Sequence, residues 1–275
     1  MALPLPDRIK KDGQYCIKGR IHLKIKFMKS LENKVALITG AGSGIGKAAA
    51  QLLATEGAKV VISDISEQHG NAAVEEIKKN GGEAFFVKAD SSKPEDNEAL
   101  VKQTIQQYGA LDIAVNNAGI GGPLSVTGEY PIDGWQKVIE INLSGVFYGM
   151  RYQIPAMLER GGSIINVASI LGQAGTKGSP AYVAAKHGVV GLTKTAALEY
   201  APKGIRINSI GPGYIKTPLL DTLDEATMNA LVSLHPIGRL GESAEVAELI
   251  LWLASSKSSF VTGSYYAVDG GYLAQ

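Results

Sequence analysis

Tyr182 and Lys186 lie four positions apart in the segment Tyr-Val-Ala-Ala-Lys, and Ser169 precedes Tyr182 by thirteen positions. On a helix, side chains at positions i and i+4 share a face, so the phenol and the ammonium group can point into one cleft. A nearby cation favours the phenolate, which predicts a pKa for Tyr182 below its ordinary value of about 10. The phenol can then act as an acid and a base while the Ser169 hydroxyl holds a substrate oxygen.

A glycine-rich turn follows the first strand-like segment. The apolar run 34–39 leads directly into Gly40-Ala-Gly-Ser-Gly-Ile-Gly46, and residues 47–54 then have a helical composition. In such a strand, turn and helix, the glycines let a pyrophosphate approach the backbone amides at the helix N-terminus. The spacing is Gly-x-x-x-Gly-x-Gly rather than G-x-G-x-x-G, and taken alone it also fits an ordinary glycine-rich β-turn.

The next strand-like segment ends in a carboxylate. Residues 58–64 end at Asp64, which lies 24 positions after the first glycine of the turn. This is close to the offset of about 20 residues at which an acid meets an adenosine ribose. A carboxylate accepts hydrogen bonds from ribose hydroxyls and repels a 2′-phosphate, and neither Ser43 nor Ile65 supplies a compensating cation. The sequence therefore predicts NAD rather than NADP, because helix capping by Asp64 would not explain the turn and the acid together.

These motifs carry a family resemblance from about Leu31 to the last residues. The chain resembles the short-chain dehydrogenase/reductase family in its glycine turn (39–46) and in the Asn-Asn-Ala-Gly segment 116–119. Pro212-Gly213 with Thr217 is similar to the segment that clasps the nicotinamide in that family. The residues that match the catalytic tetrad are Asn142, Ser169, Tyr182 and Lys186.

The resemblance implies an α/β, single-domain, doubly wound Rossmann fold. Its seven-stranded parallel sheet would have the strand order 3-2-1-4-5-6-7, with helices on both faces. The alternation of strand-like and helical segments independently predicts a parallel, doubly wound sheet. The expected strands cover 34–39, 58–64, 83–90, 111–116, 163–168, 205–209 and 264–268, and helices are expected over 93–108, after 133, over 180–200 and over 243–254.

Ligands of an open parallel sheet bind beyond the carboxyl ends of the strands, where all of these motifs fall. Asp90 and Ser91 are expected near the adenine, although Asp90 could equally cap a helix. The predicted cofactor-binding residues are Gly40, Ser43, Gly44, Ile45, Gly46, Asp64, Ile65, Asp90, Ser91, Asn117, Ala118, Gly119, Tyr182, Lys186, Pro212, Gly213, Ile215 and Thr217. The predicted substrate-binding residues are Ser169, Ile170, Tyr182 and Tyr214.

The resemblance also implies a mechanism. Tyr182 would exchange a proton with the substrate oxygen, Lys186 would stabilise the phenolate and bind the nicotinamide ribose, and Ser169 would orient the carbonyl. Asn142 would bend its helix, whereas the residues alone also allow a satisfied buried amide. We expect NAD(H)-dependent interconversion of a neutral, mostly apolar ketone and its secondary alcohol beneath a lid of about 214–240. A 3-oxoacyl thioester reductase and a catalytically silent, NAD-sensing binding protein are the alternatives.

Composition predicts an ordinary soluble enzyme. The chain has 275 residues, 45% of them hydrophobic, and a net charge of +1, which gives no indication of a nucleic-acid partner. Apolar runs are too short to span a membrane. The single cysteine, Cys16, excludes an internal disulfide and is compatible with a cytoplasmic location. The four histidines lack metal-ligand spacing, so no metal is expected.

Residues 1–30 differ from the rest, with eight Lys/Arg and two Asp, so that residues 31–275 carry a net charge of about −5. We interpret 1–30 as an N-terminal extension, either a flexible arm or a remnant of start-site choice or cloning, and 31–275 as the catalytic domain. The family resemblance further implies a homotetramer. Its subunits would pair through the helices near 133–159 and 180–200 and through the tail 265–275.

Overall fold

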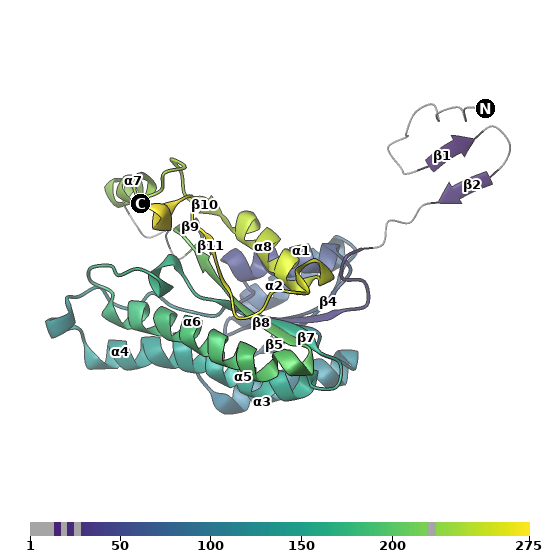
Figure 1. Cartoon of the computed structure of the whole chain (residues 1–275), viewed down its shortest axis with the longest axis horizontal. Helices are drawn as coiled ribbons and strands as arrows, with labels where there is room; N and C mark the ends of the chain where they lie inside the picture. Colours follow the sequence, from purple (N-terminus) through teal and green to yellow (C-terminus); the bar gives the residue numbers. More distant parts are fainter. Residues whose placement is uncertain (1–13, 18–20, 25–28, 219, 221–223) are drawn as a thin grey trace.

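A seven-stranded parallel sheet forms the centre of the computed structural model, which describes residues 14–17, 21–24, 29–218, 220 and 224–275 (Figure 1). Its strand order is β11-β8-β7-β6-β3-β4-β5, which confirms the expected order when the seven strands are numbered along the chain. The strands are β3 (Val35–Thr39), β4 (Lys59–Asp64), β5 (Glu83–Lys88), β6 (Ile113–Asn116), β7 (Gly162–Val167), β8 (Ile205–Pro212) and β11 (Tyr265–Val268).

Helices cover both faces of this sheet, and two buried clusters lie between the layers (Figure 1). On one face, α1 (Gly44–Thr55), α2 (Glu67–Lys79) and α8 (Ser243–Ala254) pack on strand residues such as Ile38. The other face carries α3 (Pro94–Tyr108), α5 (Gly145–Met157) and α6 (Pro180–Tyr200). Because both faces are covered, the central strands are apolar at nearly every position.

The long helix expected after residue 133 is interrupted. α4 (Ile132–Ile139) continues into a π-helical turn, Glu140–Ser144, and then into α5. A π-turn inserts one extra residue into the helical ladder and changes the direction of the side chains around it. Asn142 lies in this turn, so the helix is irregular at the one position that the family resemblance singles out.

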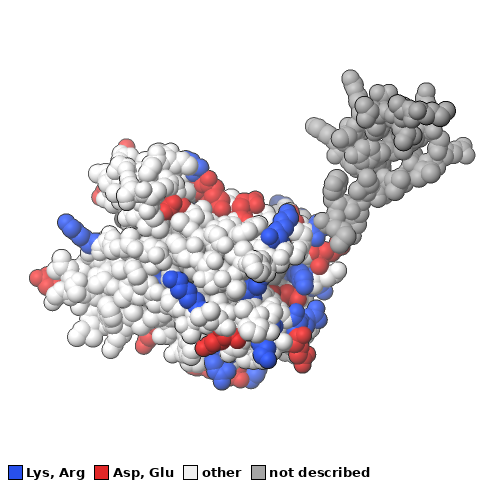
Figure 2. Space-filling view, in the orientation of Figure 1, with Lys and Arg blue, Asp and Glu red and all other residues white. Residues whose placement is uncertain are grey.

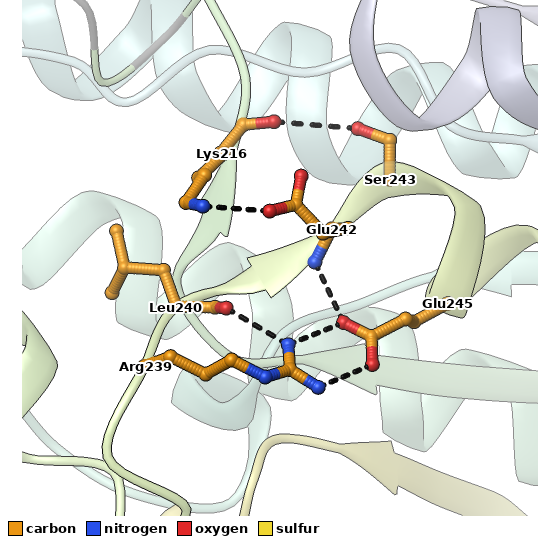
Figure 3. Close-up of polar contacts among 6 residues, drawn as sticks. All are labelled: Lys216, Arg239, Leu240, Glu242, Ser243 and Glu245. Atoms are coloured by element: carbon orange, nitrogen blue, oxygen red, sulfur yellow. Dashed lines mark hydrogen bonds and ion pairs between the residues drawn. The ribbon is translucent and has the colours of Figure 1, made fainter.

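Strand pairing and two ion pairs hold the ends of the lid, residues 214–240, in place (Figure 3). β9 (Ile215–Lys216) pairs in parallel with β10 (Gly241–Glu242), and α7 (Glu225–Ser233) lies between them in the chain. Lys216 forms an ion pair with Glu242 (Nζ to Oε1, 2.7 Å), while Arg239 binds both carboxylate oxygens of Glu245 at 2.7 and 2.8 Å. Lys216, the cation at the start of the lid, is thus already paired with a carboxylate.

Shorter elements complete the chain. β1 (Gln14–Ile17) and β2 (Ile21–Lys24) pair antiparallel, and the rest of the proposed N-terminal extension before residue 29 lies outside the described residues. Within the described parts of the chain, none of the helices has the length and apolar character that crossing a membrane demands. The 3₁₀ turns are Thr127–Glu129, Ile170–Gly172, Ala201–Lys203, Ser256–Ser258 and Tyr272–Ala274.

A chain beginning at Met28 is expected to fold as the full chain does. Ser30 donates from its amide and hydroxyl to a Glu56 carboxylate oxygen (3.1 and 2.7 Å), and the buried Leu31 donates to the Glu56 carbonyl. A chain beginning at Lys34 loses these contacts and the burial of Leu31, which stabilises the fold by about 2 kcal/mol. Thermal unfolding of the two truncations distinguishes the cases; a large loss of stability in the longer one would contradict the expectation.

Candidate active site

The residues singled out by the sequence meet at one edge of the sheet. All six strands that carry them end at or within two residues of a predicted site residue. These strand-end residues are Gly40 after β3, Asp64 at the end of β4, Asn117 after β6 and Ser169 after β7, with Pro212 at the end of β8 and Asp90 beyond β5. A parallel sheet gathers its carboxyl ends along one edge, so the fold itself forms the cleft.

The glycine turn after β3 is shaped to admit a ligand close to its backbone. Gly40 and Gly44 have φ of +61° and +51°, and α1 begins at Gly44. A Cβ at Gly46 would lie 2.3 Å from the Gly40 carbonyl oxygen, so a side chain there has no room. The Ser43 side chain makes no capping hydrogen bond, which leaves the first amides of α1 available to an anionic group.

Asp64 lies directly against this turn. Its Oδ2 accepts a hydrogen bond from the Gly42 amide (2.9 Å), and its Oδ1 accepts one from the Ser66 amide (2.8 Å). The two bonds fix the carboxylate at the edge of the turn, with the neighbouring Ile65 side chain 66% exposed. A diol such as a ribose fits this carboxylate, and a second anion does not.

The segment after β6 is held by a threonine that the sequence analysis treated only as part of a motif. Thr39 Oγ1 accepts hydrogen bonds from the amides of Asn117 (3.0 Å) and Ala118 (3.1 Å). The Asn117 side chain donates to the carbonyls of Thr39 and Gly40, so its amide is used inside the protein. A threonine at the last position of a buried strand is the sequence signal that could have indicated these hydrogen bonds between the ends of β3 and β6.

Asp90 shapes the turn that leads into α3. Its Oδ1 accepts hydrogen bonds from the amide and the hydroxyl of Ser92, and its own amide donates to Asp96. Asp90 therefore stabilises the turn before α3 and does not cap that helix, whose N-cap is Lys93, and a place for Asp90 near the adenine stays a prediction. The Ser91 carbonyl accepts from Asn97, while Gly145 leaves room for that carbonyl because a Cβ there would lie 2.8 Å from it.

Ser169, Tyr182 and Lys186 converge as the spacing predicts. Tyr182 and Lys186 lie on α6, with the Lys186 Nζ 5.5 Å from the centre of the Tyr182 ring. The Tyr182 phenol shares a hydrogen bond with Ser169, which begins the turn after β7. Lys186 is buried, and its Nζ donates to the Val167 carbonyl (2.8 Å).

The expectation of a lowered Tyr182 pKa is wrong for the protein chain alone. Burial raises the pKa of Tyr182 above its ordinary value, and the nearby Tyr214 adds to this effect. The hydrogen bond from Ser169 acts in the opposite direction and lowers the Tyr182 pKa. Burial also lowers the pKa of Lys186 to about 8. Desolvation is the largest cause of both pKa shifts, and the Lys186 ammonium donates to the Val167 carbonyl.

Asn142 is a fully buried amide with both of its polar atoms bonded. Its Oδ1 accepts a hydrogen bond from the Ile120 amide and its Nδ2 donates to the Ile120 carbonyl, both at 2.8 Å. A Cβ at Gly119 would lie 3.2 Å from Asn142 Oδ1 and 3.8 Å from Lys186 Nζ. Asn142 thus fixes the loop after β6 beside the lysine.

The segment 212–217, here called the clasp segment, lies against the glycine turn. A Cβ at Gly44 would lie 3.1 Å from Thr217 Cγ2, which brings the lid into contact range of the turn. Pro212 is buried, and the Gly213 amide donates to the Val268 carbonyl (2.9 Å). The side chains of Ile215 and Ile45 pack in and against the core, so a ligand would meet mainly their backbone atoms.

Tyr214, at the start of the lid, lies near Tyr182 and is supported by a histidine. His235 is buried, its Nε2 accepts a hydrogen bond from the Tyr214 amide (3.2 Å), and its Nδ1 lies 2.8 Å from the Leu231 carbonyl. His235 is therefore a satisfied core histidine. Ile170 is only 2% exposed, so little of it faces an open cleft. Leu219 and residues 221–223 of the lid lie outside the described residues.

The arrangement fits a dinucleotide that ends beside Tyr182. Asp64 on β4, the glycine turn after β3, Ser169 after β7 and the clasp segment after β8 follow one another along the edge of the sheet, and the buried Lys186 contacts the end of β7. The chemistry available to the chain is proton transfer at Tyr182, assisted by the Ser169 hydroxyl. No group of three or more metal-ligating side chains occurs among the residues that the structure describes.

Alcohol oxidation is expected to speed up with rising pH, whereas ketone reduction falls in the same range. Oxidation is expected to need the Tyr182 phenolate and reduction the phenol. Because burial raises the Tyr182 pKa, the pH at which the two rates are equal should be alkaline. In Ser169→Ala the hydrogen bond that lowers this pKa is lost, so the profile moves further to high pH. Initial rates in both directions from pH 6 to 10.5 test this; parallel profiles would contradict it.

Comparison with known proteins agrees with the geometry. A family model described as "Enoyl-(Acyl carrier protein) reductase" matches residues 40–273. The chain is similar to a cyclohexanol dehydrogenase of Acinetobacter sp. (strain SE19), with 56% identity over 87% of this chain and 95% of the relative. It is 44% identical to a 2,5-dichloro-2,5-cyclohexadiene-1,4-diol dehydrogenase of Sphingobium indicum, over 90% of this chain and all of that relative.

A solved structure gives the same result. The crystal structure of a short-chain type dehydrogenase/reductase from Mycobacterium marinum superposes with a TM-score of 0.86 at 37% identity, covering 90% of this chain and 98% of that chain. Sequence match, fold and the convergence of Ser169, Tyr182 and Lys186 agree. The chain therefore belongs to the short-chain dehydrogenase/reductase family and is an oxidoreductase that acts on CH–OH and C=O groups.

Proposed function

We propose that this protein is an NAD(H)-dependent dehydrogenase that interconverts a neutral, mostly apolar ketone and its secondary alcohol. The observation that carries the proposal is the convergence of Ser169, Tyr182 and Lys186 at the sheet edge where Asp64 borders the glycine turn. NAD(H), when bound, supplies or accepts the hydride. Its adenosine ribose would lie at Asp64, its pyrophosphate at the turn 40–46 and its nicotinamide at the clasp segment.

The protein's own residues transfer the proton to and from the substrate oxygen. In oxidation the Tyr182 phenolate removes the proton of the alcohol, and in reduction the phenol returns a proton to the developing alkoxide. The Ser169 hydroxyl donates a hydrogen bond to the substrate oxygen and so orients it. With the cofactor bound, Lys186 would contact the nicotinamide ribose and favour the phenolate, while Asn142 fixes the loop beside the lysine.

A neutral ring ketone is the substrate class that we favour. Tyr214 and Ile120 contribute apolar surface near Tyr182, and Lys216 is neutralised by Glu242. Two similar proteins carry names that refer to six-membered ring alcohols, cyclohexanol and a cyclohexadiene diol. A 3-oxoacyl thioester reductase would require a basic surface for an acidic carrier protein, and on the face in Figure 2 acidic and basic side chains are interspersed.

A substrate screen tests the proposal. Consumption of NADH should be fast with cyclohexanone and other cyclic ketones and slow with 3-oxoacyl thioesters, and cyclohexanol should reduce NAD. Faster turnover of the thioesters would instead identify the reductase alternative. A protein that binds NADH tightly but turns over none of these compounds would be the silent binding protein, and the proposal would fail.

We further propose a cytoplasmic homotetramer. Phe147 on α5, Leu158 just after α5 and Leu198 on α6 are 47%, 44% and 81% exposed, and a subunit interface along these helices would cover them. Small exposed residues on α6, Ala184 and Gly191, would allow close approach of a second helix. Light scattering is expected to give four times the 28.9 kDa of the chain. A monomeric mass would contradict the assembly, and a dimeric mass would contradict its four-subunit form.

A further inference from the structure

Ser169 lies just beyond the point where its strand stops pairing. The register of β7 with β8 ends at Val167, and the last contact is the hydrogen bond from the Ala168 amide to the Ile210 carbonyl (2.8 Å). The Ser169 carbonyl then accepts two hydrogen bonds, one from the Gly172 amide and one from the Tyr265 hydroxyl, both at 2.9 Å. The second donor comes from β11, two strands away in the sheet.

We propose that Tyr265 is a positioning residue for Ser169, and that its phenol anchors the turn that aims the serine hydroxyl at Tyr182. The proposal rests on the proposed function, because it concerns the residue that orients the substrate oxygen. The Ser169 hydroxyl is set by this turn, since Ser169 Oγ accepts a hydrogen bond from the Leu171 amide (3.1 Å). Movement of the Ser169 backbone therefore moves the hydroxyl.

The intervening strand is built to let Tyr265 through. A Cβ at Gly211 of β8 would lie 1.8 Å from Tyr265 Oη and 2.2 Å from its Cζ, distances that real side chains do not reach. Any other residue at 211 would force the phenol away from the Ser169 carbonyl. Gly211 and Tyr265 therefore form a matched pair, in which the missing side chain of one makes room for the ring of the other.

The phenol remains a hydrogen-bond donor under all conditions in which the enzyme would work. Burial and the negative charge of Asp269 raise the pKa of Tyr265 to about 12, so the hydroxyl keeps its proton. The contact also reaches the acid/base group, because the hydrogen bond of Ser169 lowers the pKa of Tyr182. Loss of the anchor should consequently alter the pH dependence of catalysis, which a purely structural contact would not do.

The neighbouring tyrosine provides a matched control. Tyr266 points to the opposite face of the sheet, where its ring packs edge-on against Trp252 with the centroids 5.6 Å apart. Tyr265→Phe removes one hydroxyl on the face of the sheet that α6 covers. Tyr266→Phe removes one hydroxyl from the same strand, on the face that α8 covers. Both variants keep their rings, so both should remain folded.

Tyr265→Phe is expected to lower kcat about tenfold and to change the dissociation constant of NADH less than about twofold. The pH profile of alcohol oxidation should move to higher pH, as in Ser169→Ala. Tyr266→Phe should leave kcat and the profile unchanged. Wild-type kcat and pH profile in Tyr265→Phe would overturn the proposal. Equal losses in both variants would overturn it too, since they would indicate general loosening of the edge strand.

A measurement without substrate separates this proposal from the proposed function. Hydrogen exchange of the Leu171 and Gly172 amides, both bonded to Ser169, should be faster in Tyr265→Phe than in wild type or Tyr266→Phe. Gly211→Ala should give the same faster exchange and a lower melting temperature, because the added Cβ displaces the Tyr265 ring. Adding Tyr265→Val to Gly211→Ala should restore the melting temperature, because the smaller side chain leaves room for that Cβ. Unchanged exchange in Tyr265→Phe would overturn the positioning role even if ketone reduction is observed. If the enzyme turned over no ketone, only the proposed function would fail.

Discussion

Replacing Tyr182 with phenylalanine should lower kcat by about 10²- to 10⁴-fold, the range typical of a lost general acid or base. The substitution removes only the hydroxyl that exchanges a proton with the substrate. The aromatic ring is retained, and it still packs beside Lys186 and against the small buried cluster around Val138 and Ala181. NADH should therefore bind to the variant almost as tightly as to wild type.

The measurement is turnover of a cyclic ketone together with a fluorescence titration of NADH. Tyr200→Phe is the matched control, since it removes a tyrosine hydroxyl from the C-terminal end of the same helix, in a half-buried position far along α6 from the cleft. Lys186→Ala should differ from both by weakening NADH binding as well as turnover. Near-normal activity in Tyr182→Phe would contradict the assignment of Tyr182 as the general acid and base, whatever the other variants show.

The fold was predictable because its periodicity is strong and local. The helices 180–200 and 243–254 have the bounds that the sequence predicts, and the strands differ from the predicted ones by at most three residues at either end. Buried parallel strands produce continuous apolar runs, and three of the helices between them, α3, α6 and α8, begin at Pro or Ser. The order of the strands came only from the family resemblance, because composition contains no information on which strands are neighbours.

The parts of the site that could not be predicted depend on contacts between distant segments. The Tyr182 pKa is set by burial, which the Tyr-x-x-x-Lys spacing does not contain. His235 meets Tyr214, and Tyr265 meets Ser169 across 96 positions, through the tertiary fold alone. Lys216 looks like a free cation until β9 and β10 bring Glu242 beside it. Each of these is a pairwise geometry that one sequence does not encode locally.

NADH should be preferred over NADPH by about 10²-fold or more in kcat/KM. A 2′-phosphate would lie against the Asp64 carboxylate, and two like charges about 5 Å apart repel by about 3 kcal/mol at an effective dielectric constant of 20. That energy corresponds to about two factors of ten. Lys88, the register partner of Asp64 on β5, does not relieve the repulsion because it is paired with Glu67 (3.8 Å).

Asp64→Ala should narrow the preference, and adding Glu67→Gln should narrow it further because Lys88 is then free to meet the phosphate. Asp269→Asn is the matched control for the charge. Asp269 also accepts hydrogen bonds from two backbone amides, those of Gly271 and Leu273 (3.0 Å each), but in the C-terminal turn after β11. Its replacement should leave the ratio of NADH to NADPH efficiency unchanged. Equal efficiencies in wild type, or a ratio that Asp64→Ala does not move, would show that the carboxylate does not select the cofactor.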